Sequence, residues 1–527
     1  MLSSARPLLV LLLLTGCDAL PAEGLLPDAP PTSGIERFFA SFCTACHGGG
    51  AAAGGLEDVL DADALIQTGQ IVPGSPESSP LFLRVRDGSM PPVGIEPRPA
   101  EADIAVLEAW IRAGAPSIDR PQGPDGFVTF EELVDGIALD LAQVDAIDRP
   151  FQRWISLAPL YNAGEPIDQA AAGLVLAVNG LSNEADLVEL VRVGPEGLAL
   201  RFDLRDVGWS RESWSELVAE ATFRPLLSGH PAAQFVSGLT LEARPVVPAD
   251  WFVATAWSPE HYHALLALPE SFDGLAARGL PVDVPPSRVA FARSGVSAHN
   301  RAVDYHRGNG LRLWRSWDFD GSEGDRNVVV RPATALPFAA GGEVIFDLPN
   351  GLHGYLLLDA EGLRIDAAPT RIVHDAAAVD GVVRTGGSCV RCHGAEGILP
   401  LNDDAGPVAE LFGSGEAAQV NPAFVAAGVT TARDLYTDAL GSVADPRSAH
   451  AGFVSLMDRR RGAVDPDEAA ARLGVHPDLL DALLIDSLAL VPADAVPLVL
   501  GQAIPRDAFE GAIEDLLCAL VGEACGP

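Results

Sequence analysis

The feature that constrains this chain most is a five-residue pattern, Cys-x-x-Cys-His, which occurs at residues 43–47 and again at residues 389–393. Two thiols three positions apart lie on one side of a helical turn, and the histidine follows directly. This spacing is typical of covalent c-type haem attachment, in which the thiols bond to the porphyrin and the histidine ligates the iron. The sequence therefore predicts two haem c groups. Their attachment residues and proximal ligands are Cys43, Cys46 and His47 in the first copy, and Cys389, Cys392 and His393 in the second.

Two other interpretations of the pattern are a redox dithiol and half of a zinc site. A zinc site is disfavoured because neither copy has a second cysteine pair nearby or a His-x3-5-His tail. A thioredoxin-like dithiol is disfavoured because the histidine follows directly and no βαβ pattern surrounds the motif. Haem attachment is therefore the interpretation that the spacing favours.

Met90 is the expected second axial ligand of the first haem. It precedes two prolines, which favour a stiff, extended segment that can hold the thioether in place. Methionine is rare in this chain, with only Met1, Met90 and Met457. A core-filling role for Met90 is therefore less favoured than ligation.

Residues 35–116 resemble the small cytochrome c domain of planctomycete and myxobacterial surface proteins. The resemblance rests on four motifs in order, at residues 43–48, 72–78, 90–92 and 110–116. It implies an all-α class I cytochrome c fold with His47 and Met90 as axial ligands. It covers less than a fifth of the chain.

The N-terminal segment is predicted to be a signal peptide over residues 1–16. Arg6 precedes an apolar run at residues 8–14 that is too short to span a bilayer. The end of the segment resembles the lipobox of bacterial lipoproteins, which implies that Cys17 is lipidated; an ordinary signal peptide with a spare cysteine is the alternative. Residues 17–34 then form the lipidated cysteine and a flexible tether. The expected location is the periplasm or cell surface, anchored to a bacterial membrane.

The charge and the remaining cysteines agree with this setting. A formal net charge of -37 disfavours nucleic acid as a partner, because phosphate binding needs clustered basic residues. A basic redox protein is an expected partner, and an acidic surface that maintains solubility is the alternative. In an oxidising compartment Cys518 and Cys525 are expected to form a disulfide.

The remainder of the chain is predicted to form two further domains. Residues 121–380 are expected to be a mixed α+β domain, because three apolar runs within residues 343–366 are separated by glycine-bearing turns and predict an antiparallel meander. Residues 381–527 are expected to be a helical region that carries and covers the second haem. Residues 150–400 are similar to uncharacterised regions of cytochrome-bearing myxobacterial proteins, a resemblance that implies no activity.

The sixth ligand of the second haem stays open in the sequence. Met457 is one candidate, although a methionine on an apolar helix is more often part of a core. The bis-histidine candidates are His299, His306, His353, His374 and His450.

The function that these patterns favour is electron transfer by an extracytoplasmic di-haem c-type cytochrome, through outer-sphere steps. One alternative is a haem enzyme, peroxidase-like or a substrate oxidoreductase, with an open second haem. Another is a binding protein that carries a cytochrome redox module. The chain is expected to be a carrier more than a catalyst.

Overall fold

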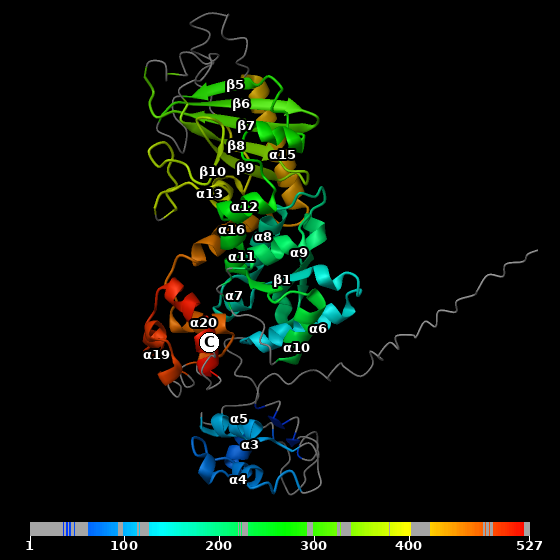
Figure 1. The fold of residues 1–527 in the computed structure, drawn as a ribbon, viewed down its shortest axis with the longest axis vertical. Helices are drawn as coiled ribbons and strands as arrows, with labels where there is room; N and C mark the ends of the chain where they lie inside the picture. Colours follow the sequence, from blue (N-terminus) through cyan, green and yellow to red (C-terminus); the bar gives the residue numbers. More distant parts are fainter. Residues whose placement is uncertain are drawn as a thin grey trace, which may run out of the picture. The chain divides into compact units, whose positions relative to one another are not determined.

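The computed structural model describes most of the chain after residue 61. The described ranges are residues 62–92, 98–112, 126–219, 230–291, 299–323, 339–378, 380–401, 422–477 and 488–520, with isolated positions at 35, 38, 39, 42, 43, 47, 59, 115, 221, 223, 327, 480 and 484. The chain divides into two compact units, Met1–Asp119 and Arg120–Pro527. Figure 1 draws the elements of both units.

The first unit contains α3 (Ala62–Gln67), α4 (Pro80–Arg86) and α5 (Glu101–Arg112), and a 3-10 turn at Pro76–Ser78. The helical residues Phe38 and Phe39 are buried, and the ring of Phe39 meets that of Trp110 edge-to-face at 5.6 Å. Leu107, Trp110 and Ile111 recur at helical spacing on α5, so they form the face that closes this small core.

The second unit begins with a four-stranded sheet in the order β2 (Val191–Val193), β3 (Ala199–Asp203), β1 (Gln152–Ser156) and β4 (Val246–Pro248). β1 pairs antiparallel with β3 and parallel with β4. The helices of this part include α6 (Phe130–Gln143), α7 (Ala158–Asn162), α8 (Ile167–Asn179), α9 (Arg211–Leu217), α10 (Pro231–Thr240), α11 (Ala249–Ala256) and α12 (Pro259–Leu265). α6 starts with a complete capping box, in which Thr129 and Glu132 each bond the other's backbone.

A close helix crossing joins this part to the C-terminal half of the unit. α8 packs against α16 (Pro446–Arg459) at a point where both helices carry glycine. A Cβ at Gly173 would lie 2.4 Å from the backbone of Gly452, so a larger residue would force the helices apart. The C-terminal half is therefore part of one continuous core.

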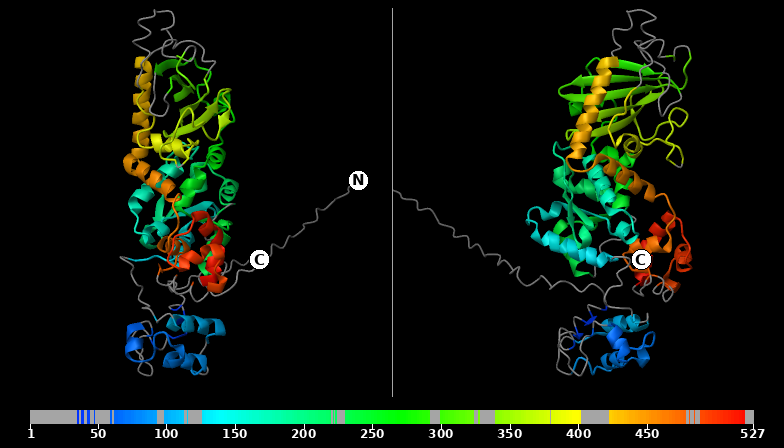
Figure 2. Two further views of the ribbon diagram at one scale, coloured as in Figure 1. Left: turned by 90° about the vertical axis from the view of Figure 1, so that its left-hand side faces the viewer. Right: turned by 180° about the vertical axis from the view of Figure 1, so that it is seen from behind.

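A six-stranded antiparallel sheet forms the other layer of the second unit. Its order is β10 (Arg364–Ile365), β9 (His353–Asp359), β8 (Gly341–Asp347), β7 (Leu311–Asp318), β6 (Arg301–Gly308) and β5 (Ser287–Phe291). The β6–β7 hairpin turns at Asn309 and Gly310, both at positive φ, as a two-residue turn requires. α15 (Pro422–Gly441) runs along one face of this sheet (Figure 2), where Phe424 contacts Tyr305 and Tyr436 contacts His353.

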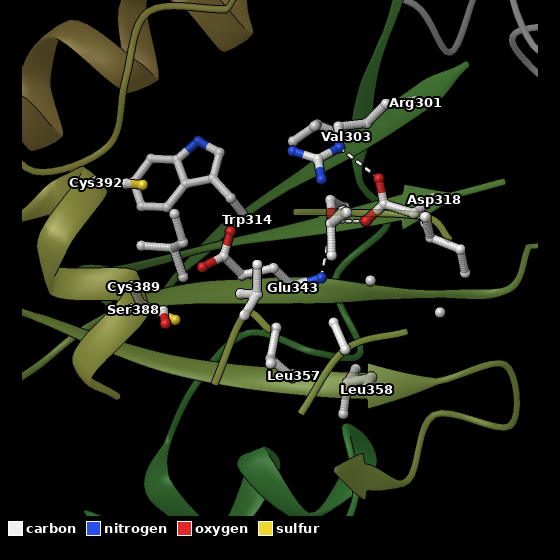
Figure 3. A pocket seen from close by; sticks show the side chains of 18 of the residues that line it. Arg301, Val303, Trp314, Asp318, Glu343, Leu357, Leu358, Ser388, Cys389 and Cys392 are labelled. Carbon is white, nitrogen blue, oxygen red and sulfur yellow. Dashed lines mark hydrogen bonds and ion pairs between the residues drawn. The ribbon is translucent and has the colours of Figure 1, made fainter. Parts of the chain in front are cut away.

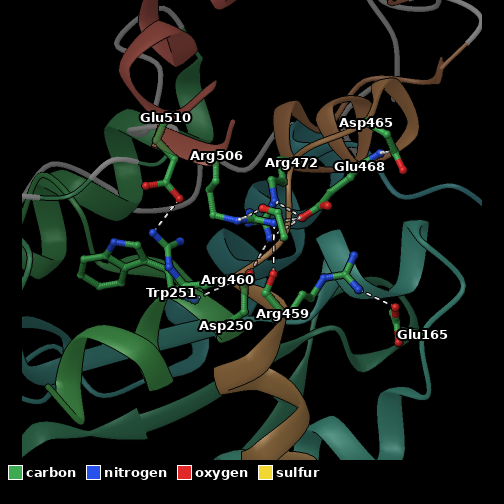
Figure 4. Close-up of polar contacts among 11 residues, drawn as sticks. Glu165, Asp250, Trp251, Arg459, Arg460, Asp465, Glu468, Arg472, Arg506 and Glu510 are labelled. Atoms are coloured by element: carbon green, nitrogen blue, oxygen red, sulfur yellow. Dashed lines mark hydrogen bonds and ion pairs between the residues drawn. The ribbon is translucent and has the colours of Figure 1, made fainter. Parts of the chain in front are cut away.

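The last helices form a second apolar cluster, which contains α17 (Pro466–Leu473), α19 (Val496–Val499) and α20 (Arg506–Leu520). Buried ion pairs connect it to α11: Arg472 donates to Asp250 and Glu468, and Arg506 also donates to Glu468 (Figure 4). Burial raises the pKa of Asp250, but the charge and hydrogen bond of Arg472 outweigh it and lower that pKa to about 2. These ions therefore fasten the C-terminal helices to the body of the unit.

The predicted fold class is wrong. The described residues contain mixed helix and strand, with sheets of four and six strands, and do not define a separate all-α cytochrome domain. The predicted meander corresponds to β8–β10, which is only half of the larger sheet. The second Cys-x-x-Cys-His copy lies on α13, at the start of the helices that follow β10, and it lines a cavity against that sheet.

The missed strands have a physical reason. The missed strands β5, β6 and β7 carry charged residues that interrupt an apolar pattern, and these residues pair with charges on the neighbouring strand. The pairs are Arg288 with Asp304, Arg301 with Asp318, and Arg312 with Asp347. In a sequence, a single charged residue suggests an exposed loop. In the sheet, the same residue is buried because it pairs with an opposite charge on the next strand.

In the described parts of the chain, no helix combines the length and apolar character needed to cross a membrane.

Candidate haem-binding sites

The second motif lies on α13 (Gly387–His393), a short helix that follows the last strand of the six-stranded sheet in the chain. Gly386 precedes it at a φ of 88°, and a Cβ there would lie 3.0 Å from the ring of Tyr262. Glycine at this position therefore lets the helix start against a buried aromatic side chain. Cys389, Cys392 and His393 follow at helical spacing, so they share one side of the helix.

All three motif residues line one cavity of about 450 Å³ between α13 and the sheet. Ligand pockets usually measure about 300–1,000 Å³. Trp314 and Glu343 also line it, from the middle strands β7 and β8. Figure 3 shows the side chain of Glu343 pointing from its strand toward the helix that carries Cys389 and Cys392.

The His393 imidazole is held on three sides. Its Nδ1 donates to the carbonyl oxygen of Gly397 at 3.3 Å, and its ring stacks on Tyr355 with centroids 5.9 Å apart. Its Nε2 lies 3.8 Å from a carboxylate oxygen of Glu343. A carbonyl bound at Nδ1 fixes the ring and leaves Nε2 to bind a metal, which is the usual arrangement for a metal-ligating histidine.

Glu343 is a half-buried carboxylate. Burial would raise its pKa, but the nearby imidazole of His393 and the charge of Arg301 outweigh burial and lower that pKa below its ordinary value. Glu343 therefore places a carboxylate 3.8 Å from the Nε2 of His393.

The two thiols do not have the character of a reactive dithiol. Burial and the charge of Glu343 raise the pKa of Cys389 well above its ordinary value, and the same two causes raise that of Cys392. Reactive cysteines have lowered pKa values. Among the residues that the structure describes, no group of three or more His, Cys, Asp and Glu side chains is arranged to hold a metal ion, as a zinc site would require.

These residues fit a covalently attached haem. Two thiols and an oriented imidazole open on one cavity, whose walls are largely apolar and include Trp314, Ile345 and Leu357. Such a wall suits a porphyrin, which is a large apolar ring. Cys389 and Cys392 would hold the ring and His393 would bind its iron.

The first motif is described only in part. Cys43 and His47 lie within the described residues, and the His47 amide donates to the Cys43 carbonyl as in a helix, whereas Cys46 lies outside them. Cys43 and Met90 both pack against the small core of the first unit. Arg98 donates to the carbonyl oxygens of Pro91 and Pro92, and so fastens the segment that follows Met90.

The candidate sixth ligands of the second site lie in different places. Met457 packs against Gly387 at the start of α13 and does not line the cavity, and the Nε2 of His450 bonds the Arg391 carbonyl. The Nδ1 of His306 bonds the Val284 carbonyl, and His353 is buried against Tyr436. His374 lines the cavity and is exposed. His299 is not among the residues that line it.

The remaining predicted residues are outside the sites. Cys518 on α20 is disulfide-bonded. Its predicted partner Cys525 lies outside the described residues, as do Cys17 and the predicted signal segment, so the pairing and the lipidation stay predictions.

Sequence reasoning missed Glu343, although a signal for it exists. Glu343 and Ile345 are two positions apart on β8, so they lie on the same face of the sheet. Ile345 pairs with Trp314 of β7 and with Tyr355 of β9. A glutamate in phase with the inward side chains of a strand is unusual unless it has a buried partner. Its place on this face marks Glu343 as a candidate site residue. The sequence does not show its partner, because His393 is 50 positions away.

Comparison with known proteins finds one family model that is similar to the segment around the first site. Residues 43–94 match the family described as planctomycete cytochrome C. No curated protein and no solved structure matches the chain. The prediction of a cytochrome c-like segment is therefore confirmed at this level. The match implies covalently bound haem c and haem-based electron transfer for this segment.

Proposed function

We propose that the protein is a di-haem c-type cytochrome that passes electrons by outer-sphere transfer. The match at residues 43–94 supports the first haem. The observation that carries the second is the cavity into which Cys389, Cys392 and His393 all open. When bound, haem c supplies a one-electron iron couple whose potential depends on its axial ligands and burial.

The chain's own residues prepare the second site for that role. Gly397 fixes the His393 ring through Nδ1, and Tyr355 supports the ring from the side. Apolar side chains such as Ile345 and Leu357 form much of the cavity wall and would limit the water around a bound haem. Fewer mobile waters keep the reorganisation that accompanies electron transfer small.

The surroundings of the protein belong to the same proposal. The signal-like segment and the lipobox-like ending before Cys17 support a location outside the cytoplasm, with a lipid anchor in a bacterial membrane. The net charge of -37 supports a basic redox protein as partner, since long-range attraction would raise the association rate.

Stopped-flow mixing of the reduced holoprotein with a basic, oxidised c-type cytochrome tests this function. The expected result is rapid, complete exchange whose rate falls steeply with added salt, because ions screen the attraction. Slow exchange that is insensitive to salt, together with steady turnover of hydrogen peroxide, would favour the haem enzyme instead. The variant Cys17→Ala is the control for the anchor: it should leave exchange unchanged and move the protein from the membrane fraction to the soluble fraction.

A further inference from the structure

We propose that Glu343 is the second axial ligand of the iron that His393 binds. The inference rests on the proposed haem at residues 389–393 and goes beyond it. It assigns to the second site a carboxylate ligand in the position that Met90 is expected to take in the first.

The two side chains are separated by a distance that suits two ligands of one metal ion. The Nε2 of His393 and a carboxylate oxygen of Glu343 lie 3.8 Å apart. Bonds from a metal ion to nitrogen and oxygen ligands are each about 2 Å, so two ligands on opposite sides of one ion lie about 4 Å apart. The observed spacing is longer than a hydrogen bond and close to this value.

The origin of the two groups is the second argument. His393 comes from α13 and Glu343 from β8, so the two groups reach the cavity from different elements. A Cβ at Gly342 would lie 1.9 Å from the Ser316 carbonyl oxygen, which shows how tightly this part of β8 sits against β7. The amide of Glu343 also donates to Ser316 Oγ at 2.8 Å. The carboxylate therefore extends from a rigid strand, as a preformed ligand should.

The carboxylate of Glu343 lies in a largely apolar cavity, where it is poorly solvated. A carboxylate in an apolar cavity is costly unless a positive charge or hydrogen-bond donors compensate it. Arg301 also lines the cavity and its charge favours the carboxylate, but its guanidinium is held by Asp318 at 2.6 Å. An iron ion between His393 and Glu343 would compensate the carboxylate directly.

The other candidates fit the position less well. Met457 packs at the opposite end of α13, against Gly387, and does not line the cavity. His374 lines the cavity but is exposed at its wall, and no contact with His393 is seen for it. Both serve as matched controls.

A carboxylate ligand would make the two haems chemically different. An anionic, hard oxygen ligand favours ferric over ferrous iron, whereas a soft thioether raises the reduction potential. Electrons would therefore pass from the second site toward the first.

Electron paramagnetic resonance of the ferric holoprotein tests the assignment, with intact mass spectrometry of the same sample to count attached haems. Because a carboxylate is a weaker-field ligand than a thioether or imidazole, the wild type should show one low-spin iron and one high-spin iron. Glu343→Gln should alter the high-spin signal and raise the lower of the two potentials. Glu343→His should convert that iron to low spin.

The controls His374→Ala and Met457→Leu should leave both signals unchanged. The assignment is overturned if the second iron of the wild type is low-spin, or if Glu343→Gln changes neither its signal nor its potential while two haems remain attached. A mass that shows no haem on residues 389–393 of the wild type overturns the di-haem function as well, so the two failures are distinguishable.

Discussion

The two copies of one pentapeptide lie in different surroundings. In the unit Met1–Asp119, Cys43 packs with Met90 on a small helical core, where a soft thioether is the expected second ligand. In the unit Arg120–Pro527, Cys389 and His393 lie on a helix against a sheet and face the carboxylate of Glu343. The motif would therefore determine the covalent attachment, whereas the fold around it would determine which side chain faces the iron from the other side.

Removal of the attaching thiols has the largest expected effect on this comparison. Cys389→Ser combined with Cys392→Ser should abolish covalent attachment at the second site, because no thiol is left to bond the porphyrin. The visible spectrum that remains should be that of the first site alone. Haem staining after denaturing electrophoresis, normalised to protein, should fall by about half, as each of two motifs holds one haem. Staining equal to that of the wild type would show that the second motif carries no haem.

Replacement of Met90 tests the other half of the comparison. Met90→Ala should remove the thioether signature from the ferric spectrum and lower the potential of one haem, because the soft sulfur ligand raises it. The second site should keep its spectrum. Met457→Leu is the matched control, since Met457 packs in the core beside α13. A loss of the signature in Met457→Leu instead would reverse the assignment.

Asp250→Asn tests the ion pairs that fasten the C-terminal helices within the second unit. It leaves the buried guanidinium of Arg472 without one of its two carboxylates. Breaking a buried pair costs about 3–5 kcal/mol, and the remaining Glu468 places the expected loss at the lower end of this range. Urea unfolding measures the loss. Asp168→Asn removes a pair whose aspartate is 95% exposed, and should change stability by less than about 0.5 kcal/mol.

Acid gives a smaller effect through the same carboxylate. The pKa of Asp250 is about 2 in the folded protein and 3.8 ordinarily, so the unfolded chain binds the proton more readily. Its contribution to stability is complete above about pH 4 and is lost as the pH falls through 2, by roughly 2 kcal/mol. The stability difference between wild type and Asp250→Asn should therefore narrow between pH 4 and pH 2. A constant difference over that range would contradict the lowered pKa.

Sequence alone predicted the first site better than the second. The order of motifs around residues 43–94 is local, so spacing was enough to indicate a cytochrome c-like segment, and the family match agrees. Cys389, Cys392 and His393 are also local and lie together on α13. Their partners are not local: Glu343 and Trp314 reach the cavity only because β7 and β8 pair in one register.

The fold class was missed for the same physical reason. The strands of the large sheet pair with their neighbours along the chain, but charged residues such as Arg301 and Asp318 are buried in it because they neutralise each other across strands. A single sequence shows each charge without its partner, so periodicity alone suggests turns at these positions. The four-stranded sheet has strands of only three to five residues, which carry little periodic signal.

The most direct measurement is peptide mapping of the mature holoprotein by mass spectrometry. A di-haem protein should carry one haem on the peptide that contains residues 43–47 and another on the peptide that contains residues 389–393. A second peptide with unmodified Cys389 and Cys392, in a sample whose first peptide is fully loaded, would contradict the di-haem function.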